Sequence, residues 1–398
     1  MIFSPLQDRA IFAVDKWVND PSSPQVFYLG GFAGTGKTTL AITLAQNILG
    51  RVFFATFTGK AAHVMRTKGC PDATTIHKLI YNPSTRDAAH LRELESALLN
   101  LDPSDVTMRT EIEEEINQEK AKLRRPAFSL NPDSELRHAK LLIIDECSMV
   151  DQRIGQDLLS FGKKILVLGD PAQLPPIRGE GFFTSNPPDL MLTEIHRQAA
   201  DSPIIRMATA VREGRGLDAG DHGSGCLVGT KADLFCKTMA RDMDQCIVGK
   251  NATRRNYNVS YRNNILGFAQ PLPVAGDRVV CLRNNHEMGI LNGQLWDVEE
   301  VRSPMVDTIE MMMLSDDGSL RCQGVVHTGH FLGLEVPWWA KKDAEEFDYG
   351  YALTCHKAQG SQWPGVLVFD ESQCFREHRD RWLYTAITRA SERVVVLR

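Results

Sequence analysis

The chain has 398 residues, which is long for one hydrophobic core, so we expect two or more domains. Hydrophobic residues make up 43% of it and charged residues 24%, as in soluble globular proteins, and we find neither a signal-peptide pattern nor an apolar stretch long enough to cross a membrane. The formal net charge of −5 disfavours a generally basic surface, and nine scattered cysteines without a C-x-x-C pair disfavour a zinc site or a disulfide framework, so we expect a cytoplasmic protein with reduced thiols.

Residues 5–19 have the apolar spacing of an amphipathic helix. Gln7 lies near its start, a short distance ahead of the Gly-rich segment described next. A side-chain amide can pair with both the donor and the acceptor edge of adenine. The alternative is a helix-capping or surface glutamine, and the spacing does not decide between the two.

Residues 26–40, VFYLGGFAGTGKTTL, predict a buried strand, a Gly-rich turn and a helix that starts near Lys37. The turn fits the pattern G-x-x-x-x-G-K-[ST], in which backbone N–H groups and a helix N-terminus surround phosphates. Lys37 can reach the terminal phosphates, and the Thr38 hydroxyl can hold Mg2+. We therefore predict that the chain binds a nucleoside triphosphate with Mg2+, through Gly34, Thr35, Gly36, Lys37, Thr38 and Thr39.

Two following segments, ATFTGKAAH and ATTIHKLI, each predict a strand that turns into a helix. Hydroxyl groups and helix N-termini on one side of a sheet are suited to holding a phosphodiester backbone without reading its sequence. Alone, each segment is more typical of an ordinary strand-to-helix turn. Residues 82–140 then change pattern and predict an inserted subdomain of charged helices, which ends in KAKLRR and the apolar Phe128.

The segment LLIIDECSMVD predicts a buried strand that ends in Asp145 and Glu146. In a protein with a phosphate loop, the first carboxylate suits Mg2+ and the second suits a general base that aligns the attacking water. The next apolar strand ends in GDPAQ, where Gln173 is suited to sensing the terminal phosphate. We expect the three strand ends to meet, because ligands gather at the carboxyl ends of parallel strands.

Taken together, GGFAGTGKTT, DECSMVD, GDPAQLPPI and LTEIHRQ resemble the motifs of superfamily 1B DNA helicases of the RecD and phage Dda type. CHKAQGSQW resembles motif V of that family, YTAITRA resembles motif VI, and GDRVVCLRNN with ILNGQLWDV resembles a small β-barrel inserted in its second motor domain. The motif order is kept from about Gln7 to Arg398.

The resemblance implies an α/β fold in which two RecA-like domains enclose ATP. By resemblance, Gln7 contacts adenine, Gly360 belongs to the nucleotide site, and Arg197 and Arg389 reach the terminal phosphate, with Arg389 as the arginine finger from the second domain. The implied domains are a first motor domain at 1–81 and 141–190, a helical insertion and candidate wedge at 82–140, a second motor domain at 191–270 and 341–398, and an SH3-like β-barrel at 271–340.

The resemblance also implies a groove for single-stranded DNA. The positions that match it are Thr58, Gly59, Lys60 and His77 in the first domain and Thr354, His356 and Lys357 in the second. Arg254 lies in a segment that resembles a backbone-contacting helix, although a solvated helix surface explains its charges equally well. Phe128 is a candidate tip for a strand-separating wedge.

These expectations lead to an ATP-dependent helicase that moves 5′-to-3′ on single-stranded DNA as a monomer and acts on tailed or forked duplexes. A single-strand binding protein or a separate nuclease would be compatible partners. One alternative is a DNA-stimulated translocase that unwinds poorly, because residues 82–140 read as helices rather than as the expected β-pin. Another is a P-loop kinase or other non-motor NTPase, which would leave the second motor domain unexplained. An AAA+ remodeller is disfavoured because it would take its arginine from a neighbouring subunit.

Overall fold

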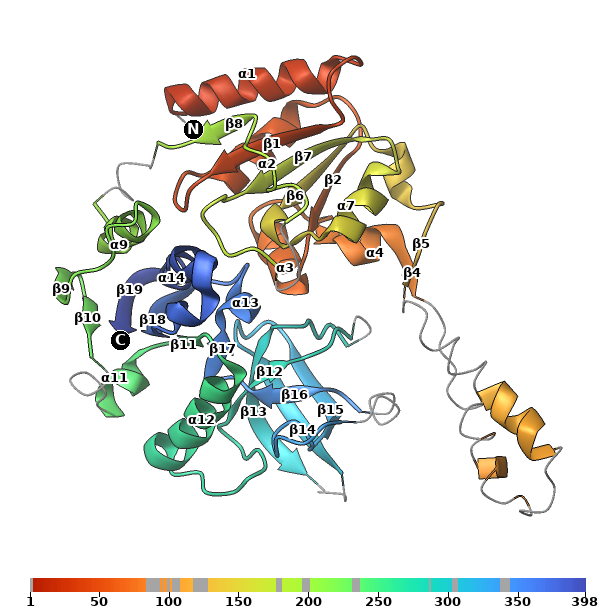
Figure 1. Ribbon diagram of the computed structural model, residues 1–398, viewed down its shortest axis with the longest axis vertical. Coiled ribbons are helices and arrows are strands. Elements are labelled where there is room, and N and C mark those ends of the chain that lie inside the picture. The colour runs from red at the N-terminus through yellow and green to blue at the C-terminus, as the bar shows by residue number, and fades with distance from the viewer. Residues whose placement is uncertain are drawn as a thin grey trace.

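The structure is a computed structural model that describes residues 3–83, 94, 96–98, 101, 108–116, 128–176, 181–194, 201–230, 237–285, 288–302, 307–336 and 344–398. It contains two six-stranded sheets, one five-stranded sheet and one two-stranded sheet. Figure 1 shows the first sheet, in red to light green, in the upper part of the view, the second sheet, in green to blue, below it, and the five-stranded sheet beside the second. Among the described residues, no helix is long and apolar enough to cross a membrane.

The first sheet is parallel throughout and has the order β3-β2-β6-β7-β1-β8. Residues of β6 alternate between two cores: Leu141 and Ile143 face one, and Leu142 and Ile144 face the other, as the pleat of a strand requires. Because both faces are covered, the strands are continuous apolar runs. The strands are β1 (Val26–Gly31), β2 (Val52–Thr56), β3 (Thr74–Thr75), β6 (Leu141–Asp145), β7 (Lys164–Gly169) and β8 (Leu190–Leu192).

Helices α1 (Pro5–Asn19) and α2 (Lys37–Asn47) cover one face of this sheet, and α4 (Ile76–Ile80) and α7 (Gln152–Leu159) cover the other. Helix α3 (Gly59–Thr67) packs near the β3 edge, where Met65 belongs to a small apolar cluster against which Phe54 and Ile42 pack. Since β8 pairs with β1, the first domain extends slightly beyond the boundary at residue 190 that the sequence predicted.

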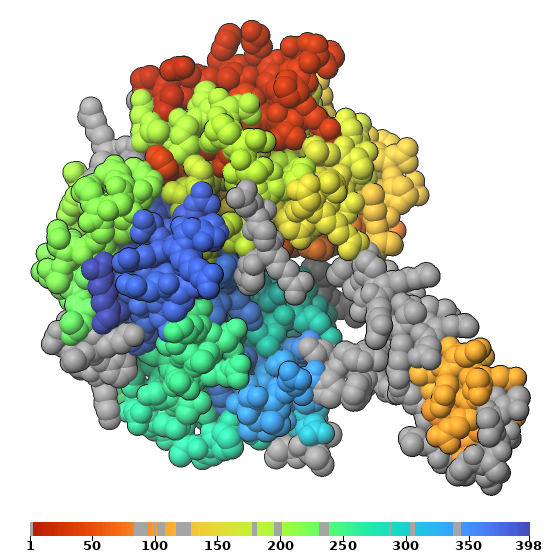
Figure 2. Space-filling view, viewed as in Figure 1, coloured from red at the N-terminus to blue at the C-terminus, as the bar shows by residue number. Residues whose placement is uncertain are grey.

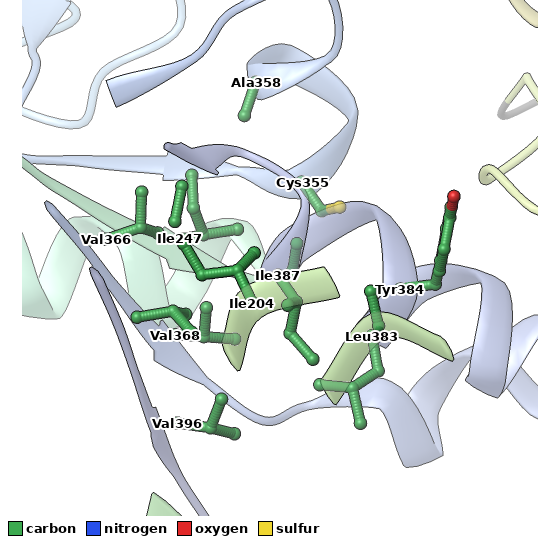
Figure 3. Close-up of a cluster of buried hydrophobic side chains, with 14 of the residues drawn as sticks. Ile204, Ile247, Cys355, Ala358, Val366, Val368, Leu383, Tyr384, Ile387 and Val396 are labelled. Atoms are coloured by element: carbon green, nitrogen blue, oxygen red, sulfur yellow. The ribbon is translucent and has the colours of Figure 1, made fainter. Parts of the chain in front are cut away.

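The second sheet has the order β17-β11-β18-β19-β10-β9 and is parallel except for the pair of β9 and β10. Helices α9 (Pro203–Arg212), α13 (Cys355–Ala358) and α14 (Arg379–Ile387) share one core with it, as Figure 3 shows for Ile204, Leu383 and Ile387. Helix α12 (Asn251–Tyr261) packs in a second core through Tyr257. The strands are β9 (Gly220–Gly223), β10 (Cys226–Gly229), β11 (Gln245–Val248), β17 (Ala352–Thr354), β18 (Trp363–Phe369) and β19 (Ala390–Leu397), and the remaining helices are α11 (Lys237–Asp242), η3 (Arg262–Leu266) and η4 (Ser372–His378).

The five-stranded sheet is inserted in the chain between η3 and β17 and is antiparallel, with the order β15-β14-β13-β12-β16. Alternate residues of β14 are buried around Trp296, which is what a half-buried antiparallel strand predicts. The predicted range of the insertion, 271–340, ends too early, because the last strand of this sheet, β16, follows residue 340. The strands are β12 (Arg278–Cys281), β13 (Leu295–Arg302), β14 (Thr308–Ser315), β15 (Arg321–His327) and β16 (Phe347–Tyr349).

At the start of 82–140, β4 (Tyr81–Pro83) pairs with β5 (Phe128–Leu130) in a two-stranded antiparallel sheet. Residues 108–116 are helical, and two of their isoleucines share a small apolar cluster with Leu94 and Leu98. Figure 2 shows this orange helix standing apart from the two main sheets. In contrast, Leu136 of η1 (Glu135–His138) is fully buried in the core of the first domain, so the boundary predicted at residue 140 lies too far along the chain.

Candidate functional site

The carboxyl ends of three neighbouring strands, β6, β7 and β1, form the centre of the candidate site. Gly30 of β1 pairs with Gly169 of β7, so the turn after β1 lies beside Asp170, and the next strand ends in Asp145. A parallel sheet brings these ends to one edge, where α/β proteins bind ligands. The expected meeting of the three strand ends is therefore present.

The Gly-rich turn has the backbone that a phosphate loop needs. Gly34 and Gly36 adopt φ angles of 80° and 76°, in the left-handed region that glycine tolerates. A Cβ on Gly31 would lie 2.7 Å from the Thr35 hydroxyl, so the turn leaves no room for a side chain there. The Lys37 ammonium donates to the carbonyl oxygens of Gly31 and Phe32 at 2.6 and 3.0 Å.

A second feature is a hydrogen bond that joins the loop to β6. The Thr38 hydroxyl donates to Asp145 Oδ2 at 2.7 Å, at the start of α2. A hydroxyl and a carboxylate are hard oxygen ligands of the kind that Mg2+ prefers. The residues present thus fit a magnesium ion held by Thr38 and Asp145, while Thr39 is exposed on α2.

Glu146 is held in an unusual backbone conformation directly after Asp145. Its φ of 55° and ψ of 44° are rare for a residue with a side chain, and such strain is concentrated at functional sites. Burial raises the pKa of its carboxyl, and the neighbouring charges of Asp145 and Asp170 act in the same direction, whereas Arg389 and Lys37 oppose them. A carboxylate with a raised pKa is suited to accept a proton from water.

Asp170 and Gln173 follow β7 and are both buried. Burial raises the pKa of Asp170, against the charge of Lys37 and a hydrogen bond from Tyr384. The Oε1 atom of Gln173 is buried and has no hydrogen-bond partner among the described residues. An orphaned buried acceptor requires an explanation, and a ligand in this site would supply one.

The second domain closes the other side of the site through α14 and α13. Tyr384 donates to Asp170 Oδ2 at 2.6 Å, and Thr385 Oγ1 accepts from the Leu174 amide at 2.8 Å. Gln359 donates to the Leu174 carbonyl at 2.7 Å. Arg389 is buried and donates to the carbonyl oxygens of Thr385 and Ser361, with its charge close enough to shift the pKa of Glu146. The structure therefore brings Arg389 to the site, as expected.

Gln7 and Gly360 are the other two described residues that were predicted to lie in the nucleotide site. Gln7 caps α1: its Oε1 accepts from the Ser4 amide, and its Nε2 donates to the Thr35 carbonyl at 3.1 Å. It thus supports the loop through the capping role that sequence analysis had left open. Gly360 lies against the start of α3, where an added Cβ would be 3.2 Å from Ala61 Cβ, and its predicted place in the nucleotide site stays a prediction. Arg197 lies outside the described residues.

The predicted DNA contacts of the first domain lie at the start of α3 and near α4. Thr58 caps α3 by accepting from the Ala61 amide. The Lys60 ammonium lies 5.0 Å from the centre of the Trp363 ring, and Leu291 of the insertion blocks any side chain at Gly59. His77, half-buried between Phe57 and Tyr81, has a pKa that burial lowers.

In the second domain, Thr354, His356 and Lys357 stand at the end of β17 and in α13. Burial lowers the pKa of His356. Lys357 has an exposed side chain, but the protein packed around it and the nearby charge of Arg254 lower its pKa to about 8. Gly360, at the end of this segment, approaches Thr58, so the two predicted sets of DNA residues lie side by side.

Arg254 is placed differently from the prediction. Its guanidinium is buried and pairs with Asp348 at 2.7 Å, which ties α12 to β16. Asn258 of the same helix bonds the backbone of Tyr349 and Ala352, and Arg262 forms a fully buried pair with Asp277. These side chains join the second domain to the five-stranded sheet. The side chain of Phe128 lies outside the described residues.

Sequence reasoning missed three contributors: Tyr384, Trp363 and Asp316. Tyr384 stands inside YTAITRA, five residues before Arg389, so its motif was visible although its contacts were not. Trp363 closes the segment CHKAQGSQW. Asp316 lies in a turn of the insertion, 3.6 Å from the Lys60 ammonium. Nothing in the sequence indicates that these two residues meet.

Comparison with protein families gives two matches. A model described as an AAA domain matches residues 14–224, more than half of the chain, and a model described as a UvrD-like helicase C-terminal domain matches residues 349–397. The matched ranges contain the phosphate loop and motif VI, respectively.

Among curated proteins, the ATP-dependent RecD2 DNA helicase of Deinococcus radiodurans is 28% identical over 92% of this chain. The chain spans less than half the length of the curated relatives it matches, 46% for that helicase.

Among solved structures, the fold is similar to Pif1 helicase from Candida albicans, with a TM-score of 0.54, 17% identity and coverage of 100% of this chain and 94% of that one. Bacteroides Pif1 in complex with ADP-AlF3 and single-stranded DNA gives a TM-score of 0.55 at 19% identity, with coverage of 99% and 92%. The chain therefore belongs to the AAA domain family, and its predicted likeness to superfamily 1B helicases of the RecD and phage Dda type is confirmed.

Proposed function

We propose that the chain is an ATP-dependent DNA helicase that moves 5′-to-3′ on single-stranded DNA. The observation that carries the proposal is the pairing of two walls across one site: a phosphate loop with Asp145 and Glu146 on the first domain, and α14 with Arg389 on the second. The RecD2 relative is named as an ATP-dependent DNA helicase, which agrees with this assignment. The 5′-to-3′ polarity rests on the family resemblance.

In the proposed reaction, Lys37 and the loop amides bind the phosphates of ATP, and Thr38 with Asp145 hold Mg2+, which would neutralise charge on the transferring phosphoryl group. Glu146 accepts a proton from the attacking water, and Gln173 senses the terminal phosphate. Arg389 stabilises charge that develops on the phosphoryl oxygens. Because the arginine and the loop belong to different domains, ATP occupancy is linked to domain closure.

The DNA groove would run past Thr58 and Lys60 of the first domain and past His356 and Lys357 of the second. These residues offer one hydroxyl, a helix start, an imidazole and two ammonium groups, which suit phosphate contacts rather than base reading. Two such contact sets on domains that approach and separate with ATP would move the chain along one strand. We assign the five-stranded sheet to the SH3-like insertion and the segment between β4 and β5 to the candidate wedge.

The test uses two forked duplexes, one with a 5′ and one with a 3′ single-stranded tail, with ATP and Mg2+. Lys37→Ala is the inactive variant, and Lys16→Ala, an exposed lysine at the end of α1, is its control. We expect unwinding of the 5′-tailed duplex only, lost in Lys37→Ala and kept in Lys16→Ala. Unwinding of the 3′-tailed duplex only would overturn the polarity.

If neither duplex opens, the ATPase rate with and without single-stranded DNA separates the alternatives. Strong stimulation by DNA would identify a translocase that unwinds poorly. A rate that DNA leaves unchanged would contradict the DNA-motor proposal and favour a non-motor NTPase.

A further inference from the structure

We propose that Tyr384 is a positioning residue for ATP hydrolysis, which ties the phosphate loop of the first domain to the arginine of the second. Its hydroxyl accepts from the Ala33 amide at 3.0 Å and donates to Asp170 Oδ2 at 2.6 Å. Ala33 and Asp170 belong to the first domain, and Tyr384 belongs to α14 of the second. The inference rests on the function proposed above and assigns a further residue to the same site.

The contact with Ala33 matters because of where that amide stands. Ala33 lies inside the turn from Gly31 to Lys37, whose N–H groups surround phosphates in proteins of this kind. The Tyr384 oxygen is the acceptor for this amide, so the second domain holds the backbone of the phosphate loop itself. The interdomain contact and the proposed phosphate site therefore share one turn of the chain.

The hydroxyl of Tyr384, and not its ring, makes the hydrogen bonds to the first domain. Tyr384 and Asp170 are 2% and 1% exposed, so water cannot replace the hydrogen bond between them. A buried carboxylate that loses a donor is costly to leave unpaired. The ring itself packs in the core of the second domain, and Figure 3 shows the hydroxyl directed away from that cluster.

The route from Tyr384 to Arg389 is short and runs through backbone hydrogen bonds. The Tyr384 carbonyl accepts from the Thr388 amide at 3.0 Å, and the Thr385 carbonyl accepts from Arg389 Nε at 3.1 Å. A shift of α14 at Tyr384 would therefore move the guanidinium of Arg389. Arg212 adds a second contact with the same loop, since its guanidinium lies 3.5 Å from the centre of the Phe32 ring.

The test compares Tyr384→Phe, which removes only the hydroxyl, with Tyr28→Phe. Tyr28 is a buried tyrosine of β1 whose hydroxyl has no hydrogen-bond partner among the described residues, so it is a matched control. Three quantities are measured on each folded variant: amide hydrogen exchange of the peptide that contains Ala33, the affinity for a non-hydrolysable ATP analogue, and kcat and KM for DNA-stimulated ATP hydrolysis.

For Tyr384→Phe we expect faster exchange at Ala33, analogue affinity no weaker than in the wild type, and a kcat that is lower by about tenfold with little change in KM. Tyr28→Phe should match the wild type in all three. In the background of Asp170→Asn, the effect of Tyr384→Phe on kcat should shrink, because the two residues act through one hydrogen bond.

A kcat equal to that of the wild type, or a loss of kcat of the same size in both backgrounds, would overturn the inference. A wild-type chain that does not hydrolyse ATP in the presence of DNA would instead overturn the proposed function. The exchange of Ala33 reports on the contact in either case.

Discussion

The Lys60 ammonium of the first domain lies 3.6 Å from the Asp316 carboxylate of the five-stranded sheet. Next to it, His63 of α3 lies 3.2 Å from Asp317 in the same turn. Lys60 is a proposed phosphate contact, so a carboxylate of the insertion stands where a DNA phosphate would stand. In the proposed DNA complex, the insertion would compete with DNA for this cation.

Replacing Asp316 by asparagine should therefore strengthen binding of single-stranded DNA. An ion pair near the surface contributes about 0.2–1 kcal/mol, so the expected decrease in Kd is about 1.4-fold to fivefold. The control is Glu335→Gln, which removes the same charge from an exposed position of the insertion. Fluorescence anisotropy with a labelled oligonucleotide measures the Kd of each variant. Equal gains in affinity in both variants would mean that the change in net charge, and not the loss of the pair with Lys60, causes the effect.

The pKa of Lys357 predicts how DNA binding responds to pH. A lysine is charged below its pKa and neutral above it, and the protein packed around Lys357 lowers its pKa to about 8. Between pH 7 and pH 9, the affinity for single-stranded DNA should fall by up to about tenfold as this charge is lost. Lys357→Arg, which stays charged, should flatten the profile. An identical profile in that variant would exclude Lys357 from the DNA contact.

Glu146 predicts the acid limb of the ATPase profile. A general base must be deprotonated, and the raised pKa of Glu146 moves the loss of kcat to a higher pH than an ordinary glutamate would give. Glu146→Gln should lower kcat by about 10²–10⁴-fold at neutral pH while the ATP analogue still binds. Glu135→Gln, on the exposed surface, is the control. A Glu146→Gln enzyme with near-normal kcat would exclude Glu146 as the base.

Arg254 should matter for stability. Removing one partner of a buried ion pair leaves an uncompensated charge and costs about 3–5 kcal/mol, so Arg254→Ala should unfold at clearly lower denaturant concentration. The neighbouring Arg255 is exposed, and Arg255→Ala should have little effect. Unchanged stability with weakened DNA binding in Arg254→Ala would restore the sequence-based expectation of a DNA contact.

Much of the site could be predicted from sequence because its signals are local. The apolar run before Asp145 and the Gly-rich turn before Lys37 each define a strand or helix end within a few residues, and strand ends of one parallel sheet must share an edge. Lys37, Thr38, Asp145 and Glu146 therefore lie together as expected.

The remaining contacts depend on pairs far apart in the chain. Arg254 and Asp348 are 94 residues apart, and Tyr384 and Asp170 are 214 apart. Periodicity gives the face of a helix but not its partner, so Arg254 on α12 could be assigned to solvent or to DNA with equal reason. Only the packing of the second sheet against its insertion decides that this guanidinium is internal.

The central claim is that one chain carries both walls of its ATP site. Lys37→Ala removes the lysine of the phosphate loop, and Arg389→Ala removes the arginine of the second domain. Each variant should therefore lack DNA-stimulated ATPase activity. The decisive measurement is the ATPase rate of an equimolar mixture of the two variants. If each chain supplies its own arginine, the mixture stays as inactive as either variant. Recovery of activity in the mixture would mean that the arginine comes from a neighbouring chain, and would contradict the account.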